Sequence, residues 1–269
     1  MSIIKNNFEK MNVTKIKNSK NNNKLTMITA YDALFSKLFE EIADMILVGD
    51  SLNMSFAGKP DTLSATLDQM IYHTNAVCAG APKAFVILDM PFGTYLNENQ
   101  ALENAVKVYQ QTNANAIKIE GGEDRAHIVK HLCSNSVAVM GHIGLMPQYV
   151  RSEGGYKVRG KTENDTLQLI KDAIAVEKAG AFAIVVEGVK SEAALRITQA
   201  VNIPVIGIGA GNVTDGQVLV WSDMLGFFED FKPKFVRHYL DGAKLVKDSV
   251  NQYRNDVQDN SFPSKEEEY

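Results

Sequence analysis

Acidic side chains close three short apolar segments of the chain. Asp50 follows residues 45–48, Asp89 follows residues 84–88, and Glu120 follows residues 116–119. If these segments are parallel strands, their carboxyl ends lie at one edge of the sheet and the three carboxylates converge. Such an all-oxygen ligand set favours Mg²⁺ over zinc or copper. The alternative is that each acid caps the helix after it, since Asp and Glu favour helix N-termini. The convergence of three acids favours the metal site.

Lys118 lies in the same segment as Glu120, two residues earlier, so both side chains point to one side of a strand. The isoleucines between and before them would face the helix layer, which predicts that Lys118 and Glu120 point into the sheet's interior. A lysine there needs an anion, because a buried unpaired charge is costly. A substrate carboxylate or a developing enolate oxygen would satisfy it. A salt bridge to a neighbouring acid is the other interpretation.

Other motifs leave their chemistry open. Glu187 ends the apolar segment 182–186 and fits a metal ligand, a general base or a structural acceptor equally well. The glycine-rich residues 207–212 follow a late strand and lack the sixth-position glycine of a dinucleotide loop, which leaves an anion-binding loop or a tight turn. His142 ends another segment and could contact substrate or be structural. By contrast, His127 and His131 fall in a peripheral helix, so a zinc site is not expected there.

A long connection, Met146–Lys161, is rich in glycine, basic residues and tyrosine. Long loops in compact domains are usually functional or disordered. If it lies on the active face, this loop would serve as a lid.

The elements that must position these residues alternate along the chain. Eight segments read as strands: 24–30, 45–50, 84–90, 116–121, 137–142, 181–188, 203–208 and 218–226. Segments of helical period lie between and after them, at 100–112, 165–179, 191–201 and 234–250. Alternating strands and helices predict a parallel sheet, and eight units without a break in composition favour a single-domain (β/α)₈ TIM barrel. We expect an arm over residues 1–23, the barrel over 24–253 and a tail over 254–269.

Composition sets limits on the partners. The chain has 269 residues, 45% of them hydrophobic, and a formal net charge of −4. That charge gives no electrostatic reason to bind nucleic acid or an anionic membrane. There is no apolar segment of membrane-spanning length and no secretory leader. Two cysteines, Cys78 and Cys133, both fall in predicted helices, so no disulfide is expected and a reducing cytoplasm fits the chain.

Several motifs together resemble the ketopantoate hydroxymethyltransferase family, over roughly residues 11–253. They are Thr29–Asp32, Val48–Ser51, Tyr72–Thr74, Lys118–Gly122, Gly141–Gly144, Gly154–Lys157 and Pro204–Gly216. Departures from the family's pattern are modest: Gly188 stands where relatives can carry cysteine, and Met146 where threonine is common.

The resemblance implies a function for each candidate residue. It implies a homodecameric barrel with one Mg²⁺ per subunit, which moves a one-carbon unit from 5,10-methylenetetrahydrofolate to 3-methyl-2-oxobutanoate. The products would be 2-dehydropantoate and tetrahydrofolate, in the first step of pantothenate biosynthesis. The implied metal-binding residues are Asp50, Asp89 and Glu120. The implied substrate contacts are Asp50, Ser51, Asp89 and Lys118, and the implied proton acceptor is Glu187.

Two other functions have to be weighed. The phosphoenolpyruvate mutase and isocitrate lyase group also uses Mg²⁺ and oxoacid enolates, and it shares a start like Tyr31-Asp32-Ala33. Its Asp-x-Asp-x-Gly motif would fall on residues 89–93, where Pro91 stands in place of the second acid. A non-catalytic barrel is the other possibility, and the inward Lys118 with three acids argues against it.

Overall fold

The computed structural model describes residues 10–229 and 232–269, and the barrel predicted from the sequence is present. Eight parallel strands close in sequence order, with β8 paired to β1. The strands are β1 (Leu25–Thr29), β2 (Met45–Val48), β3 (Val86–Asp89), β4 (Ala116–Glu120), β5 (Val139–Gly144), β6 (Ala183–Glu187), β7 (Val205–Ile208) and β8 (Gly216–Leu219). Eight paired strands leave no exposed sheet edge.

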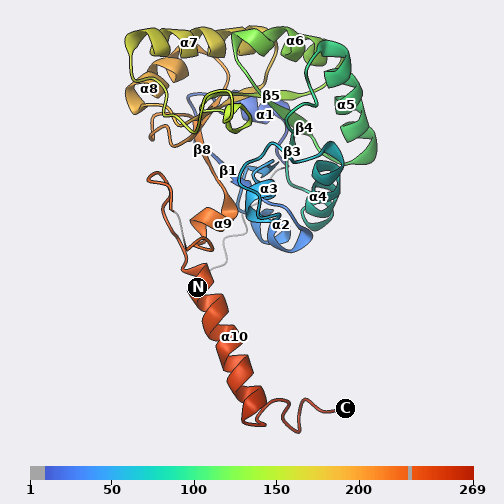
Figure 1. The fold of residues 1–269 in the computed structure, drawn as a ribbon. Coiled ribbons are helices and arrows are strands. Elements are labelled where there is room, and N and C mark those ends of the chain that lie inside the picture. Colours follow the sequence, from blue (N-terminus) through green and yellow to red (C-terminus); the bar gives the residue numbers. More distant parts are fainter. Residues whose placement is uncertain (1–9, 230–231) are drawn as a thin grey trace. The chain divides into compact units, whose positions relative to one another are not determined.

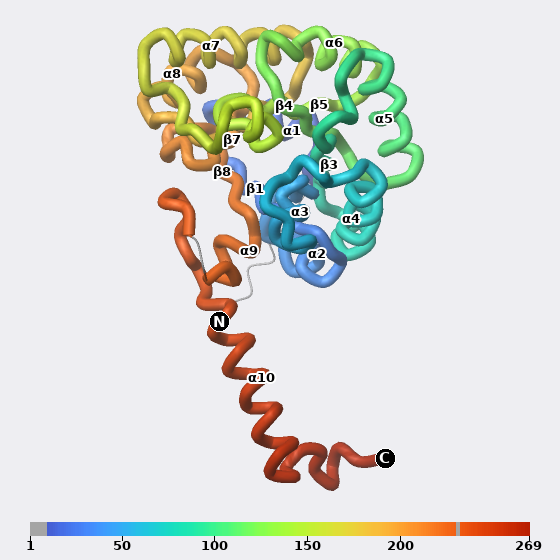
Figure 2. Tube along the Cα trace, viewed as in Figure 1, coloured from blue at the N-terminus to red at the C-terminus, as the bar shows by residue number. Residues whose placement is uncertain are grey.

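Helices cover the outside of the strands in the order in which they occur in the sequence (Figures 1 and 2). They are α2 (Ala33–Phe39), α3 (Leu52–Ser55), α4 (Leu67–Gly80), α5 (Glu98–Gln111), α6 (Ala126–Ser134), α7 (Glu163–Lys178) and α8 (Ser191–Ala200). Their starts follow local chemistry: Thr66 and Gln69 form a capping box at α4, and Asn97 and Thr162 accept backbone amides at α5 and α7. The predicted helices at 100–112, 165–179 and 191–201 are confirmed to within two residues.

The interior of the barrel is filled by side chains from alternate strand positions. The buried cluster includes Phe85 and Ile87 of the β3 segment, Ala116 of β4, Met140 of β5 and Val185 of β6. Since side chains on a strand alternate between its faces, the next inward positions are 89, 118, 142 and 187. The packing of the core thus selects which residues reach the mouth of the barrel.

A short helix lies at the other end of the barrel. Helix α1 (Val13–Asn18) places Ile16, which is fully buried, in the same core cluster as Leu25 and Phe85. Lys20 donates to the carboxylate of Asp215 at 2.7 Å and to the Thr198 carbonyl. Residues 13–20 of the predicted N-terminal arm are therefore part of the packed barrel, whereas residues 1–9 lie outside the described residues.

The chain divides into two compact units, Met1–Leu219 and Val220–Tyr269. The first contains the whole barrel. The second contains α9 (Trp221–Met224) and α10 (Gly242–Gln258). The domain limits expected from the sequence, 24–253 for the barrel and 254–269 for the tail, stay predictions. Among the described residues, none of the helices has the length and apolarity to cross a membrane.

The predicted elements near the C-terminus were wrong in their limits. The strand expected over 218–226 ends at Leu219, because the amides of Asp223 and Met224 both donate to the Val220 carbonyl and coil the chain into α9. The helix expected over 234–250 begins only at Gly242 and continues to Gln258. Its start is delayed because the amides of Tyr239 and Gly242 are already bonded to the carbonyls of Met224 and Leu225.

Neither cysteine is in a disulfide, as expected: Cys78 lies in α4 and Cys133 in α6, and both are free thiols. Burial raises the pKa of each thiol to about 11. We therefore expect iodoacetamide at pH 7.5 to alkylate both thiols about a hundredfold more slowly in the native protein than in urea, because the thiolate is the reactive form. The measurement is mass spectrometry of the modified peptides over time, and equal rates in buffer and in urea would contradict the burial of these thiols.

Candidate active site at the carboxyl ends of the strands

Strand register brings the predicted polar residues together at one mouth of the barrel. Asp89 of β3 is level with Lys118 of β4, and Glu120 of β4 is level with His142 of β5. Glu187 ends β6 opposite Gly144. Asp50 directly follows β2. Five strand ends therefore deliver ionisable side chains to one region, as their spacing predicted.

Lys118 is the cation at the centre of this cluster. Its Nζ lies 2.6 Å from Asp89 Oδ1 and 3.2 Å from His142 Nδ1, and both Lys118 and Asp89 are almost wholly buried. Burial acts to lower the pKa of Lys118, but the carboxylates of Asp89, Glu120 and Asp50 outweigh it, so the pKa is raised and the ammonium is retained. The inward orientation predicted for Lys118 and Glu120 is confirmed. The salt bridge to a neighbouring acid is also present.

The three carboxylates are fully buried and close to one another. Asp50 N donates to Asp89 Oδ2 at 3.3 Å. Burial first, and then repulsion by Asp89 and Glu120, raises the pKa of Asp50. Burial also raises the pKa of Asp89, although the charge of Lys118 opposes it. Burial acts to raise the pKa of Glu120 as well, but contacts with His142, Lys118 and the Gln148 amide together outweigh burial, so this pKa is lowered. Three carboxylates thus share a buried site in which Lys118 and His142 are the neighbouring cationic groups.

His142 connects the cluster to Glu187. Its Nδ1 lies 3.5 Å from Glu120 Oε1, and its Nε2 lies 3.3 Å from Glu187 Oε2. Burial and the charge of Lys118 oppose protonation of His142, but the carboxylates of Glu120 and Glu187 raise its pKa to about 9. The Glu187 side chain is 20% exposed, unlike those of Glu120 and His142. Among Glu120, His142 and Glu187, it is therefore the carboxylate of Glu187 that is accessible to solvent.

Ser51 lies beside the cluster and contacts Tyr31, which follows β1 in the chain. Tyr31, which is fully buried, has its hydroxyl 2.8 Å from Ser51 Oγ. His73 contacts the Tyr31 carbonyl at 2.6 Å, and the Phe56 ring packs edge-on against the rings of both. Two of the sequence blocks singled out above, 29–32 and 72–74, therefore support the third, 48–51.

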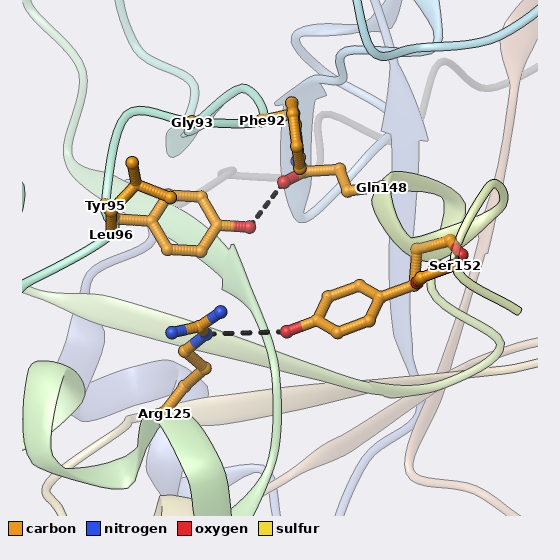
Figure 3. Close-up of a pocket in the computed structure, with 8 residues that line it drawn as sticks. Phe92, Gly93, Tyr95, Leu96, Arg125, Gln148 and Ser152 are labelled. Atoms are coloured by element: carbon orange, nitrogen blue, oxygen red, sulfur yellow. Dashed lines mark hydrogen bonds between the residues drawn. The ribbon is translucent and has the colours of Figure 1, made fainter.

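Two buried residues in this region were not identified from the sequence, although one of them, Gln148, lies in the long loop Met146–Lys161. Gln148 Nε2 donates to Asp50 Oδ2 at 3.0 Å, and the Gln148 backbone amide donates to Glu120 Oε2 at 3.0 Å. The hydroxyl of Tyr95 donates to Gln148 Oε1. Both residues also line a pocket of about 130 Å³ with Phe92, Gly93, Leu96, Arg125, Tyr149 and Ser152, shown in Figure 3. They come from loops whose contacts no local pattern predicts.

Other predicted features lie outside the cluster. His127 is in α6 and His131 four residues on, and among the described residues no group of three or more His, Cys, Asp and Glu side chains is arranged to hold a metal ion. In the glycine-rich segment, Gly211 has φ +80° and a Cβ there would lie 2.4 Å from Ser191 Oγ. This close approach to the start of α8 accounts for the glycine and favours the tight turn.

The long loop after β5 is tied to its neighbours. Its first part forms a 3₁₀ turn, Pro147–Tyr149, which carries Gln148. Arg151 Nη2 lies 3.1 Å from Asp61 Oδ2, in the connection between α3 and α4, and the Arg159 guanidinium lies 2.8 Å from Asp165 Oδ1. The loop thus reaches across the mouth of the barrel.

Comparison with known proteins identifies the family of the chain. The model of the family described as ketopantoate hydroxymethyltransferase matches residues 10–265. The chain belongs to this family. It is 84% identical, over the full length of both chains, to 3-methyl-2-oxobutanoate hydroxymethyltransferase of Aliarcobacter butzleri strain RM4018. It is 53% identical to the enzyme of that name from Helicobacter pylori strain ATCC 700392 / 26695, covering 97% of each chain.

Membership of this family therefore identifies the reaction, which the fold by itself does not. Among solved structures, a phosphonopyruvate hydrolase superposes with a TM-score of 0.63 over 96% of this chain and 93% of the other, at 13% identity. A 2,3-dimethylmalate lyase gives a TM-score of 0.60, also at 13% identity, covering 94% and 89%. These similarities show a shared fold alone. As a ketopantoate hydroxymethyltransferase, the chain is an enzyme that acts on small molecules in the first step of pantothenate biosynthesis, not a lyase, a mutase or a scaffold.

Glu187 in this hydroxymethyltransferase packs closely against a glycine of the neighbouring strand β5. Gly144 has φ +101°, and a Cβ there would lie 2.3 Å from the Glu187 carbonyl oxygen and 2.8 Å from Val189 Cγ2. We expect Gly144→Ala to lower the free energy of unfolding by about 2–5 kcal/mol, since it combines a left-handed backbone with overpacking.

Gly58→Ala is the matched control, because Gly58 has φ +63° but open space around it. It should cost only the backbone strain, about 1–2 kcal/mol. Urea unfolding followed by circular dichroism measures both variants. Equal losses in the two would show that the contact with Glu187 does not constrain residue 144.

Proposed function

We propose that the cluster at the mouth of the barrel transfers the one-carbon unit of 5,10-methylenetetrahydrofolate to C3 of 3-methyl-2-oxobutanoate. The folate co-substrate follows from the family identity. The observation that carries the assignment of residues is the placement of a buried ammonium, Lys118, and a partly exposed carboxylate, Glu187, on either side of His142. Such a pair provides a proton acceptor and a site for negative charge, which an enolisation requires.

The residues of the cluster fit a divalent cation. Asp50, Asp89 and Glu120 are buried beside one another, so their carboxylates present several oxygen donors in one place. Hard oxygen donors suit Mg²⁺, which often takes only one or two protein carboxylates and fills its other positions with water or substrate. A site of this kind needs fewer than three protein ligands, and it is compatible with the lack of a three-ligand group among the described residues.

We therefore assign direct metal binding to Asp50 and Asp89, with one Mg²⁺ per subunit. Glu120, also expected as a metal residue, already accepts the amide of Gln148 through Oε2 and lies near His142 through Oε1. Its contribution would then run through water and through its charge. When bound, the cation would act as a Lewis acid that polarises the keto group of the oxoacid.

Glu187 is proposed as the proton acceptor. Its carboxylate is the most exposed of the four acids of the cluster, and His142 Nε2 lies 3.3 Å behind it. A general base must reach the proton that it removes, here the C3 proton of the oxoacid, and its orientation must be fixed. His142 would supply that orientation through its contact with Glu187 Oε2.

Substrate binding is proposed for Asp50, Ser51, Asp89 and Lys118. Lys118 would take up negative charge on the oxoacid as the C3 proton leaves, because its ammonium is held in a dry site where such charge is otherwise costly. Ser51 would donate its hydroxyl from the position that Tyr31 fixes. Asp50 and Asp89 would act through the cation, since two anions have no direct attraction for an oxoacid.

We further propose that the enzyme works as a homodecamer in the cytoplasm. The family resemblance suggests the assembly, and exposed apolar residues on and after α2 support association, since Leu34, Leu38 and Ile42 are each more than half exposed. Sedimentation equilibrium of the purified protein tests this, and a monomer at micromolar concentration would contradict it.

Removal of the cation tests the metal assignment. We expect excess EDTA to abolish formation of 2-dehydropantoate and added Mg²⁺ to restore it, because the buried carboxylates of Asp50 and Asp89 are hard oxygen donors of the kind that Mg²⁺ prefers. A coupled product assay follows the reaction. Undiminished turnover in excess EDTA would remove Mg²⁺ from the proposal.

Substitution of the base tests the role of Glu187. Glu187→Gln keeps the shape of the side chain but cannot accept the proton, so exchange of the C3 hydrogen of 3-methyl-2-oxobutanoate with deuterated solvent should slow by about 10²–10⁴-fold. Proton NMR without folate isolates this step from one-carbon transfer.

Glu192→Gln, on the exposed surface of α8, is the matched control and should exchange at the wild-type rate. Exchange by Glu187→Gln within a few-fold of wild type would show that another group is the base.

A further inference from the structure

Gln148 is a buried amide that bonds at every polar position of its side chain. Its Nε2 donates to Asp50 Oδ2 and to the Met90 carbonyl, each at 3.0 Å, and its Oε1 accepts the hydroxyl of Tyr95. Its backbone amide donates to Glu120 Oε2 at 3.0 Å. One residue from the loop after β5 thus fixes carboxylates at the ends of β2 and β4.

Chemistry allows only one orientation of this amide. The Met90 carbonyl and a carboxylate can only accept, so the NH₂ group must face them, which leaves Oε1 for a donor. Tyr95 is that donor: its hydroxyl gives its proton to Gln148 Oε1 and accepts the backbone amide of Glu120 at 3.3 Å. Burial and the nearby Glu120 carboxylate raise the pKa of Tyr95, so the hydroxyl stays protonated.

The pair also separates two spaces. In Figure 3 the Tyr95 ring and the Gln148 side chain point toward each other at the pocket. Arg125 also lines this pocket and donates to the Tyr149 hydroxyl. On their other side Tyr95 and Gln148 contact the carboxylate cluster. They therefore shield buried anions from the pocket, where water would otherwise compete for the carboxylate oxygens.

We propose that Gln148 is a positioning residue that sets the separation and orientation of the Asp50 and Glu120 carboxylates for a divalent cation, with Tyr95 fixing its amide. The proposal rests on the metal site of the proposed function. Residues that orient ligands in this way usually change metal affinity by about 10–100-fold when they are removed.

The experiment compares Mn²⁺ binding, measured by electron paramagnetic resonance, in wild type and two variants. Gln148→Met keeps the volume but removes the side-chain hydrogen bonds, and Tyr95→Phe removes a single hydroxyl. We expect dissociation constants about 10–100-fold higher for Gln148→Met, and a smaller increase for Tyr95→Phe. The double variant should bind no more weakly than Gln148→Met, because the hydroxyl acts only through the amide. Turnover of Gln148→Met should also recover as Mg²⁺ is raised.

Gln100→Met is the matched control. Gln100 bonds to the Gly93 carbonyl and the Leu96 amide in the loop that carries Tyr95, but it contacts none of the carboxylates. Its substitution should change the unfolding midpoint without changing Mn²⁺ affinity.

Each result has a distinct meaning. Unchanged Mn²⁺ affinity in both Gln148→Met and Tyr95→Phe would overturn the proposal, as would an equal loss in Gln100→Met. If Gln148→Met does not fold, Tyr95→Phe decides by itself, because it leaves the amide in place. Wild type that binds Mn²⁺ but forms no 2-dehydropantoate would contradict the proposed function and leave the positioning role standing.

Discussion

The site depends on the burial of one lysine among acids. Lys118 and Asp89 form a salt bridge of 2.6 Å with almost no access to water. In such surroundings each charge is stable only while its partner is present, and removal of one partner of a buried pair costs about 3–5 kcal/mol. Asp50, Glu120 and His142 lie around this pair and depend on it in turn, because burial shifts the pKa of each and their charges and that of Lys118 shift it further. The cluster is therefore one electrostatic unit, costly to assemble and well suited to charge that develops during a reaction.

The geometry of the barrel makes it possible to bury this cluster. Parallel strands in register place residues 89, 118, 142 and 187 at successive inward positions above a core of Phe85, Ile87, Ala116, Met140 and Val185. The lower layers are apolar and supply the hydrophobic stabilisation, while the top layer carries the chemistry. At the opposite end, Ile16 of α1 extends the same core, which leaves the polar layer at the end that carries the strand-following loops. Stability and chemistry thus occupy different levels of one structure.

Loop residues support the side chains that the strand ends place at the mouth of the barrel. Gln148 donates to Asp50 through an amide that carries no charge, and the Tyr95 hydroxyl donates to the amide oxygen of Gln148. The hydroxyl of Tyr31 contacts that of Ser51 in a similar supporting position. The Arg151–Asp61 contact links the loop after β5 to the β2–α4 connection, which also carries Asp50. Asp50 is thus supported by elements from both sides of the mouth. The phosphonopyruvate hydrolase and the lyase share this fold, so the arrangement of strands by itself does not determine the reaction.

The sequence by itself determined the barrel and the residues on its strand ends. Alternating apolar segments and helical periods are local signals, and the period of two along a strand places Lys118 and Glu120 on one face without any knowledge of the fold. The resemblance of several motifs to a known family then indicated the reaction. Local signals failed where bonding is non-local: the segment 220–226 coils and α10 begins late because their backbone groups pair with each other across the C-terminal unit. For the same reason only the tertiary structure could identify Gln148 and Tyr95, whose partners lie 98 and 53 residues away along the chain. A hydrogen bond between distant loops leaves no periodicity in the sequence, because its two ends are brought together only by the closure of the barrel.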